Sequence, residues 1–176
     1  MMRMNRIMKK KAVKFFDTAV PVILLILYLL SVFFLPGIEK EVRKISITAV
    51  LLVSSFFDIR DREIPLLACI SVSGISIIHA IFVSFSLFSW IVSFVLLSVF
   101  LVLYSINKNN IGLGDIFIVS LCVQSLLPED AFRFLFLTFA LSSLAGLIKC
   151  IRAKSMKNVA IPLSPCIAAA FIILLP

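Results

Sequence analysis

The stretch Asp58-Ile59-Arg60-Asp61-Arg62-Glu63-Ile64-Pro65 ends one long apolar segment and begins the next. A second polar stretch, Gly112-Leu113-Gly114-Asp115, lies in the same way at the start of a later apolar segment. An ionisable side chain at the edge of a hydrophobic span is costly and usually faces a cavity or a partner. Asp58 and Asp115 directly adjoin such spans, which predicts that the fold brings their two carboxylates together.

The composition is typical of an integral membrane protein. Hydrophobic residues make up 62% of the 176-residue chain and charged residues 15%, whereas soluble domains average about 45–50% and about 25%. A soluble chain of this length could not bury so much apolar surface. The net charge of +8 comes from basic residues in short loops and at the N-terminus. This pattern indicates membrane topology and a lipid bilayer as partner, not nucleic-acid binding.

Seven apolar segments are expected to form helices, because a spanning helix needs about 20 apolar residues, or fewer where its end is buried in protein. The predicted fold is an all-α, polytopic transmembrane helix bundle. Two segments are short, and both adjoin the acidic stretches, as expected where a site meets the helix end. The segments cover residues 19–36, 44–57, 64–85, 88–106, 115–127, 131–149 and 159–175.

The N-terminal region is predicted to be retained as an additional helix. Residues 1–14 carry six basic side chains before the first apolar run, an outline shared with signal peptides. However, the run is long, and Phe33-Phe34-Leu35-Pro36 lacks the small residues of a cleavage site. We therefore expect a basic N-terminus, an extra helix and a charged turn in residues 1–43, with the turn at 37–43, followed by a six-helix core in residues 44–176.

The distribution of Lys and Arg predicts the orientation, because these residues accumulate on the cytoplasmic side of membrane proteins. With a cytoplasmic N-terminus and seven spans, thirteen of the seventeen basic residues fall on the cytoplasmic side. The same assignment places Asp58 and Asp115 on that face, although neither residue entered the count. We expect a multi-pass protein of the cytoplasmic membrane with both aspartates at the cytoplasmic side.

Two facing carboxylates can hydrolyse a peptide bond without a metal. One acts as a general base on water, and the other, protonated, polarises the carbonyl and later protonates the leaving amine. Gly112 and Gly114 permit unusual backbone angles and the close approach of another chain segment, so Asp115 can lie at a tight, accessible helix start. By itself, the Gly-x-Gly-Asp pattern is also typical of a simple turn with an N-capping aspartate.

No metal or other cofactor is expected. The four cysteines, Cys69, Cys122, Cys150 and Cys166, show no Cys-x-x-Cys spacing. We interpret them as small buried hydrophobic residues, in preference to a metal or disulfide site. His79 is the only histidine and lies in an apolar run, so we interpret it as a packed helix residue.

Together these motifs resemble the type IV prepilin peptidase family, which are membrane aspartyl proteases of the GxGD type. The family pattern has an Asp-x-Arg-x-Arg-x-Ile-Pro stretch, here residues 58–65, and a later Gly-x-Gly-Asp, here residues 112–115. It also has an Ile-Pro-x-x-Pro element in the last helix, here Ile161-Pro162-Leu163-Ser164-Pro165. The resemblance covers about residues 44–175.

The resemblance implies an aspartic endopeptidase that removes the short basic leader from type IV pilin-like precursors at the cytoplasmic membrane face, in pilus assembly or secretion. It implies Asp58 and Asp115 as the catalytic pair, supported by Gly112 and Gly114. Bifunctional members also carry a cysteine-rich domain after their first helix and methylate the new N-terminus. The corresponding link is short here and has no Cys, so we expect a peptidase without methyltransferase activity or bound zinc.

Two positions depart from the family pattern. Leu66 follows the Ile-Pro where the family often has Asn, and Phe117 lies two places after the aspartate of the glycine motif where the family often has Lys. These departures concern contacts with the substrate and leave the pair of aspartates intact.

Several alternatives remain open at the level of the sequence. Asp61 and Glu63 either anchor the chain at the interface or attract the basic leader of a substrate. Pro162 and Pro165, predicted to lie within the last helix, either kink it or leave an unwound edge that holds the substrate. The alternatives to a peptidase are a small ion- or proton-coupled transporter or channel that uses the two aspartates, and a non-enzymatic assembly subunit.

Helix dipoles predict unequal protonation of the pair. Asp58 ends its helix, where the dipole disfavours a carboxylate, and Asp115 begins one, where the dipole favours it. On this argument Asp115 is the ionised base and Asp58 is the protonated acid.

Overall fold

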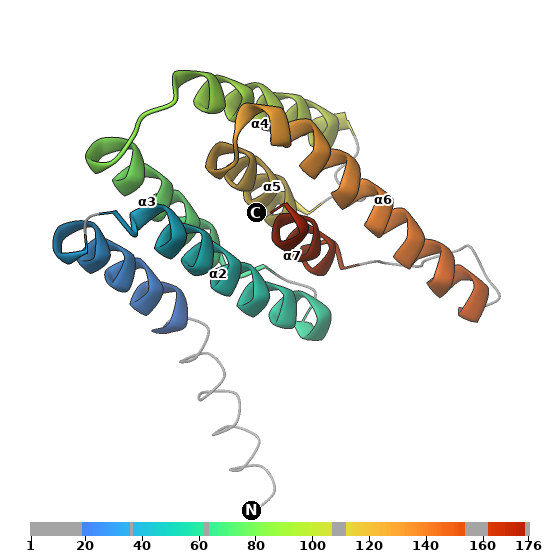
Figure 1. Ribbon diagram of the computed structural model, residues 1–176. Helices are drawn as coiled ribbons and strands as arrows, with labels where there is room; N and C mark the ends of the chain where they lie inside the picture. Colours follow the sequence, from blue (N-terminus) through green and yellow to red (C-terminus); the bar gives the residue numbers. More distant parts are fainter. Residues whose placement is uncertain (1–18, 36, 62–63, 107–111, 154–161, 175–176) are drawn as a thin grey trace, which may run out of the picture.

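The apolar segments fold into helices that lie side by side and are joined by short connections (Figure 1). The computed structural model describes residues 19–35, 37–61, 64–106, 112–153 and 162–174. Within these ranges the regular structure consists of seven helices and contains no strand. The predicted all-α class is therefore confirmed for the described part of the chain.

Each predicted apolar segment overlaps one observed helix. The first is an N-terminal helix, Ala19–Phe34. The others are α2 (Glu39–Asp61), α3 (Leu66–Phe82), α4 (Leu87–Ile106), α5 (Leu113–Ser125), α6 (Pro128–Ala153) and α7 (Ser164–Ile173).

The second helix begins earlier than predicted, so the expected charged turn at residues 37–43 is wrong. Gly37 forms the turn with a φ of 100°, a conformation that glycine adopts without strain. Its N–H donates a hydrogen bond to Glu39 Oε2 at 2.7 Å. Helix α2 starts at Glu39, where Glu39 and Glu41 place negative charge at the positive end of the helix dipole. The expected boundary at residue 43 thus falls inside α2.

The last helix begins later than predicted. Helix α7 starts at Ser164, so Pro162 precedes it and Pro165 lies in its first turn. A proline is tolerated there because the first N–H groups of a helix have no intrahelical partner. The expected position of Pro162 within the helix is therefore wrong, whereas Pro165 lies inside α7 at a place where a proline causes no kink. The Pro-x-x-Pro element instead forms the start of α7.

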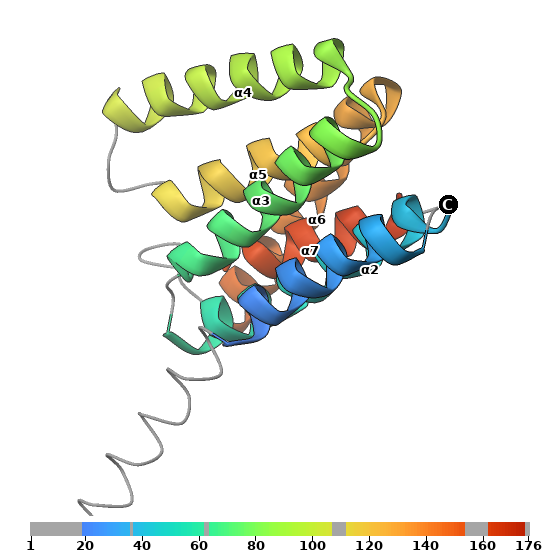
Figure 2. The same cartoon turned by 90° about the vertical axis from the view of Figure 1, so that its left-hand side faces the viewer.

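The core lies where α2, α3, α5 and α7 meet. Helix α2 packs against α7 and α3, and α5 packs against α3 and α4. Their inward faces contribute Ile47, Val72, Val119 and Ile167 to one buried apolar cluster. Successive helices run in alternating directions, so the end of α2 and the starts of α5 and α7 lie at the same end of the bundle, toward the left in Figure 2.

The N-terminal helix is packed onto the same core. Tyr28 is fully buried, and its hydroxyl lies 2.8 Å from Nδ1 of His79 on α3. The other ring nitrogen of His79 lies 3.1 Å from Ser84 Oγ. Leu25 packs closely against Gly74, where a Cβ would lie 2.8 Å from Leu25 Cδ1. His79 is therefore a packed helix residue with both nitrogens hydrogen-bonded, in agreement with its interpretation from the sequence.

Among the described residues, two helices are long and apolar enough to cross a membrane, α4 and the Glu129–Arg152 part of α6. Only 11% of the most apolar stretch of α4 and 17% of that of α6 lie buried inside the protein. A core helix of a soluble protein would instead be mostly buried. The other described helices are either too short or too charged to cross a membrane by length and composition alone.

Candidate functional site

Asp58 lies in the last turn of α2, and only 7% of its surface is exposed. Ser54 lies four residues earlier, so both side chains project from the same face of the helix. Ser54 Oγ is 3.2 Å from Ser164 Oγ, and the N–H of Ser164 donates a hydrogen bond to Asp58 Oδ2 at 2.9 Å. Two α2 residues one turn apart thus contact the first residue of α7.

Asp58 caps helix α7. The first N–H groups of a helix have no intrahelical acceptor, and α7 has no side-chain cap hydrogen bond from its own N-cap residue, Leu163. The Asp58 carboxylate accepts one of these N–H groups and lies at the positive end of the α7 dipole. Pro165 has a fixed φ that suits the first helical turn. The Pro-x-x-Pro element therefore presents Ser164 to Asp58.

The electrostatic environment of Asp58 combines opposing effects. Burial raises the pKa of its carboxyl above the usual range, while the N–H of Ser164, the charge of Lys149 on α6 and the backbone of Leu163 lower it. The dipole argument from the sequence considered only the end of α2, which disfavours a carboxylate. The start of α7 favours a carboxylate at the same position, so the dipoles of the two helices act on Asp58 in opposite directions.

Asp115 lies in the first turn of α5, as the sequence predicts, and is partly buried. Its Oδ1 is buried and has no hydrogen-bond partner within the described part of the chain. Asp58 lies at the same end of the bundle, because the end of α2 and the start of α5 lie together there (Figure 2). A buried carboxyl oxygen without a donor costs least in the protonated form, so the surroundings of this oxygen favour the neutral acid.

The two glycines of the second motif have different roles. A Cβ at Gly112 would lie 3.0 Å from Asp115 Oδ2, so this glycine leaves room for the carboxylate. A Cβ at Gly114 would lie 2.9 Å from Ile64 Cβ, closer than real Cβ contacts come. Ile64 belongs to the Asp58–Pro65 stretch. Gly114 therefore marks the point at which the two sequence motifs pack against each other.

The remaining candidate residues differ in their surroundings. Asp61 is exposed, and its Oδ1 lies 3.5 Å from Nε of Arg60. Glu63 lies outside the described residues. Pro162 and Pro165 are half-buried and lie on either side of Ser164 in the sequence.

Sequence reasoning missed Ser54, Ser164 and Lys149. The spacing of Ser54 and Asp58 could have placed both on one helix face. Pro165 could have marked the first turn of a helix, and therefore a free N–H at Ser164. The charge of Lys149 acts on Asp58 because α6 packs against α7. No local sequence signal predicts that packing.

The described residues contain no group of three or more His, Cys, Asp or Glu side chains placed to hold a metal ion. No protein-family model, curated protein or solved structure matches the chain. Asp58 and Asp115 lie at the same end of the helical bundle (Figure 2) in different surroundings, one hydrogen-bonded to the start of α7 and one with a carboxyl oxygen that has no partner among the described residues.

Replacing Gly114 with alanine is expected to force the two motifs apart. The added Cβ would press on Ile64 Cβ, an atom held directly by the backbone, so the backbone must move. We expect a loss of about 1–3 kcal/mol in the free energy of unfolding, measured as a lower midpoint of thermal unfolding in detergent. Ser143→Ala, at an exposed position of α6, is the control. Equal midpoints for the two variants would contradict this contact.

Proposed function

We propose that the protein is an aspartic endopeptidase that removes the basic leader from pilin-like precursors at the cytoplasmic membrane face. The observation that carries this proposal is the unequal aspartate pair: Asp58 is buried and hydrogen-bonded, and Asp115 has a buried carboxyl oxygen without a protein donor. Acid–base catalysis by two carboxyls requires such different environments. The substrate class comes from the motifs that resemble the prepilin peptidases, and we propose peptidase activity without methyl transfer.

The proposal includes a polytopic arrangement in the membrane. Large apolar side chains are exposed on every described helix, among them Leu52 on α2, Phe94 on α4 and Phe132 on α6. Exposed apolar surface on this scale is unusual for a soluble monomer, and it is expected where lipid surrounds the bundle. The distribution of Lys and Arg supports an orientation with the N-terminus and the aspartate pair on the cytoplasmic side.

In the proposed reaction Asp58 is the general base and Asp115 is the general acid. Asp58 accepts a proton from water as the water oxygen bonds to the scissile carbonyl carbon, and Asp115 gives its proton to the carbonyl oxygen. When the carbon–nitrogen bond breaks, the amine leaves with the proton that Asp58 had accepted. Asp115 then recovers a proton from a hydroxyl of the intermediate, which becomes the new carboxyl group. The Ser164 N–H keeps the Asp58 carboxylate oriented throughout.

A site at the ends of helices also suits the proposed substrate. A pilin-like precursor has a polar, basic leader followed by an apolar helix, so its cleavage point lies where the membrane meets the cytoplasm. Asp61 lies about one turn after Asp58 on α2, and it is exposed to solvent. An exposed acid beside the catalytic pair attracts a basic leader by a modest, salt-screened amount.

Each aspartate of the pair is expected to be essential for processing. Co-expression with a pilin-like precursor should give leader removal in the wild type and none with Asp58→Ala or Asp115→Ala, read as the size of the precursor on an immunoblot. Glu129→Ala removes an acid from the first turn of α6 and should process normally. Asp58→Asn keeps an oxygen that can accept the Ser164 N–H, so it separates lost chemistry from lost fold. Leader removal that survives loss of either carboxyl would exclude the mechanism.

The order of protonation within the pair is also testable. We expect the remaining Asp58 in an Asp115→Asn variant to titrate at lower pH than the remaining Asp115 in an Asp58→Asn variant, because Asp58 has the helix N–H donor. The measurement is the carboxyl carbon chemical shift by NMR across a pH series. The opposite order of titration would show that the α7 cap does not decide which residue is the base.

Reversing the charge beside the pair should affect only basic leaders. The Asp61→Lys/Glu63→Lys variant is expected to slow leader removal severalfold at low salt, and the difference should shrink as salt screens the charges. A precursor whose leader lysines are replaced by glutamine is the control and should be cleaved equally by both proteins. Unchanged cleavage of the basic leader would show that the two acids only anchor the chain at the interface.

A further inference from the structure

The end of the bundle opposite to the aspartate pair contains a cavity of about 330 Å³. It is formed where α2, α4 and α6 begin and where α3, α5 and α7 end, and its lining includes Lys40, Arg43 and Lys44 of α2. Fifteen residues separate Arg43 from Asp58 along α2, which corresponds to about 22 Å at 1.5 Å per residue. The cavity is therefore distinct from the aspartate site.

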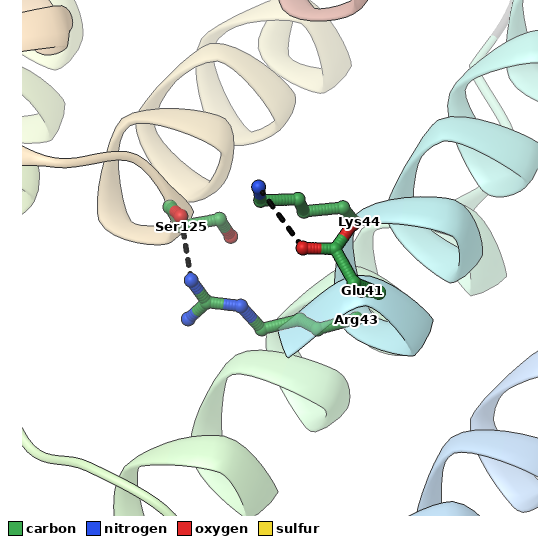
Figure 3. A network of polar contacts seen from close by, with 4 residues as sticks. All are labelled: Glu41, Arg43, Lys44 and Ser125. Atoms are coloured by element: carbon green, nitrogen blue, oxygen red, sulfur yellow. Dashed lines mark hydrogen bonds and ion pairs between the residues drawn. The ribbon is translucent and has the colours of Figure 1, made fainter. Parts of the chain in front are cut away.

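Arg43 is half-buried and extends from α2 toward the end of α5 (Figure 3). Its Nη2 donates a hydrogen bond to the carbonyl oxygen of Ser125 at 2.9 Å, which satisfies one acceptor at the negative end of the α5 dipole. A guanidinium carries five N–H donors. Within the described part of the chain, no carboxylate lies within ion-pair distance of Arg43. The charge and the remaining donors are therefore available to an anion.

The neighbouring lysines add positive charge to the same wall. Lys44 and Arg43 both extend from α2 toward α5 in Figure 3, and Lys44 Nζ makes a 3.4 Å ion pair with Glu41 Oε1. Glu41 is exposed and does not belong to the cavity lining. Lys40 also lines the cavity, is exposed and has no ion-pair partner among the described residues. Three cations thus face the cavity from the first two turns of one helix.

The other side of the cavity contributes hydroxyls and an indole ring. Ser86 and Ser89 lie at the start of α4 with their hydroxyl oxygens 3.1 Å apart, and both line the cavity. Trp90 follows them in the lining, and tryptophan is enriched at the headgroup level of membranes. Asp130 also lines the cavity. Its Oδ1 is 3.2 Å from Nη1 of Arg133, so a cation outside the α2 set partly offsets the charge of this carboxylate.

We propose that this cavity binds a phosphate group, carried either by an anionic phospholipid headgroup or by a soluble phosphate ester. The planar fork of Arg43 matches two phosphate oxygens at once, and lysine and serine add single donors. The volume lies at the lower end of the range of about 300–1,000 Å³ that small-molecule sites occupy. The site uses none of the residues of the proposed peptidase reaction, so it stands or falls independently of that reaction.

Trp90 gives a direct readout, because it is the only tryptophan in the chain and lines the cavity. The full chain would be placed in phosphatidylcholine nanodiscs, whose headgroup phosphate is neutralised by its own choline. One arm replaces part of this lipid with phosphatidylglycerol, and a second arm adds glycerol 1-phosphate to the buffer. Sodium chloride at equal ionic strength is the control for screening. We expect a saturable change in Trp90 fluorescence in at least one of the two phosphate arms and none with chloride.

Variants decide whether the α2 cations form the site. Arg43→Gln is expected to weaken the apparent affinity by about tenfold or more, since it removes a charge-assisted pair of hydrogen bonds. Lys40→Gln should weaken it severalfold, and because Lys40 is exposed, this variant remains informative even if Arg43→Gln fails to fold. Arg152→Gln removes the same charge from the last turn of α6, at the other end of the bundle, and should leave the affinity unchanged.

Each outcome bears on the proposal. A response to phosphatidylglycerol alone identifies a lipid site, and a response to glycerol 1-phosphate alone identifies a soluble ligand. Both results support phosphate binding if Lys40→Gln or Arg43→Gln weakens the response. The proposal is overturned if no phosphate arm changes the fluorescence, if chloride gives the same change, or if both α2 variants bind as tightly as Arg152→Gln.

Discussion

The hydrogen bond from the Ser164 N–H to the Asp58 carboxylate joins the end of α2 to the start of α7. A buried carboxylate is costly without a donor, and a helix start leaves its first N–H groups without an acceptor, so each group satisfies the need of the other. The Ser54–Ser164 contact one turn away fixes the same junction. Because this junction orients Asp58, the proposed catalytic base is also a structural link between two core helices, and the geometry of the pair depends on it.

Polar chemistry is concentrated at the two ends of the bundle. At one end lie the two aspartates, with Gly114 packed against Ile64 so that the two motifs meet. At the other end lie the α2 cations around the cavity. Helix α2 carries both Arg43 and Asp58 and spans the distance between them. An apolar middle with polar and charged residues at both ends is the arrangement expected of a bundle that exposes one end to each side of a membrane.

Apolar length was enough to locate the helices in the described part of the chain, and the position of Asp115 in a first helical turn followed from its sequence context. Where charge and proline decide the boundaries, the predictions failed. Glu39 and Glu41 were assigned to a turn although acids favour a helix start. Pro162 was placed inside the last helix, although it precedes Ser164, where α7 begins. The environment of Asp58 could not be derived locally, because its partners come from α7 and α6. The dipole of α2 alone therefore omits the start of α7, which favours a charged Asp58.

The central claim is that residues 58 and 115 belong to one site. The most direct test places cysteines at both positions in a chain whose native cysteines are replaced, and treats membranes with a short bifunctional thiol reagent. A Ser54→Cys/Ser164→Cys pair, whose native hydroxyls lie 3.2 Å apart, is the positive control. We predict an intramolecular cross-link between positions 58 and 115, identified by mass spectrometry of the digested protein. A cross-link in the control pair with none between 58 and 115 would contradict the account.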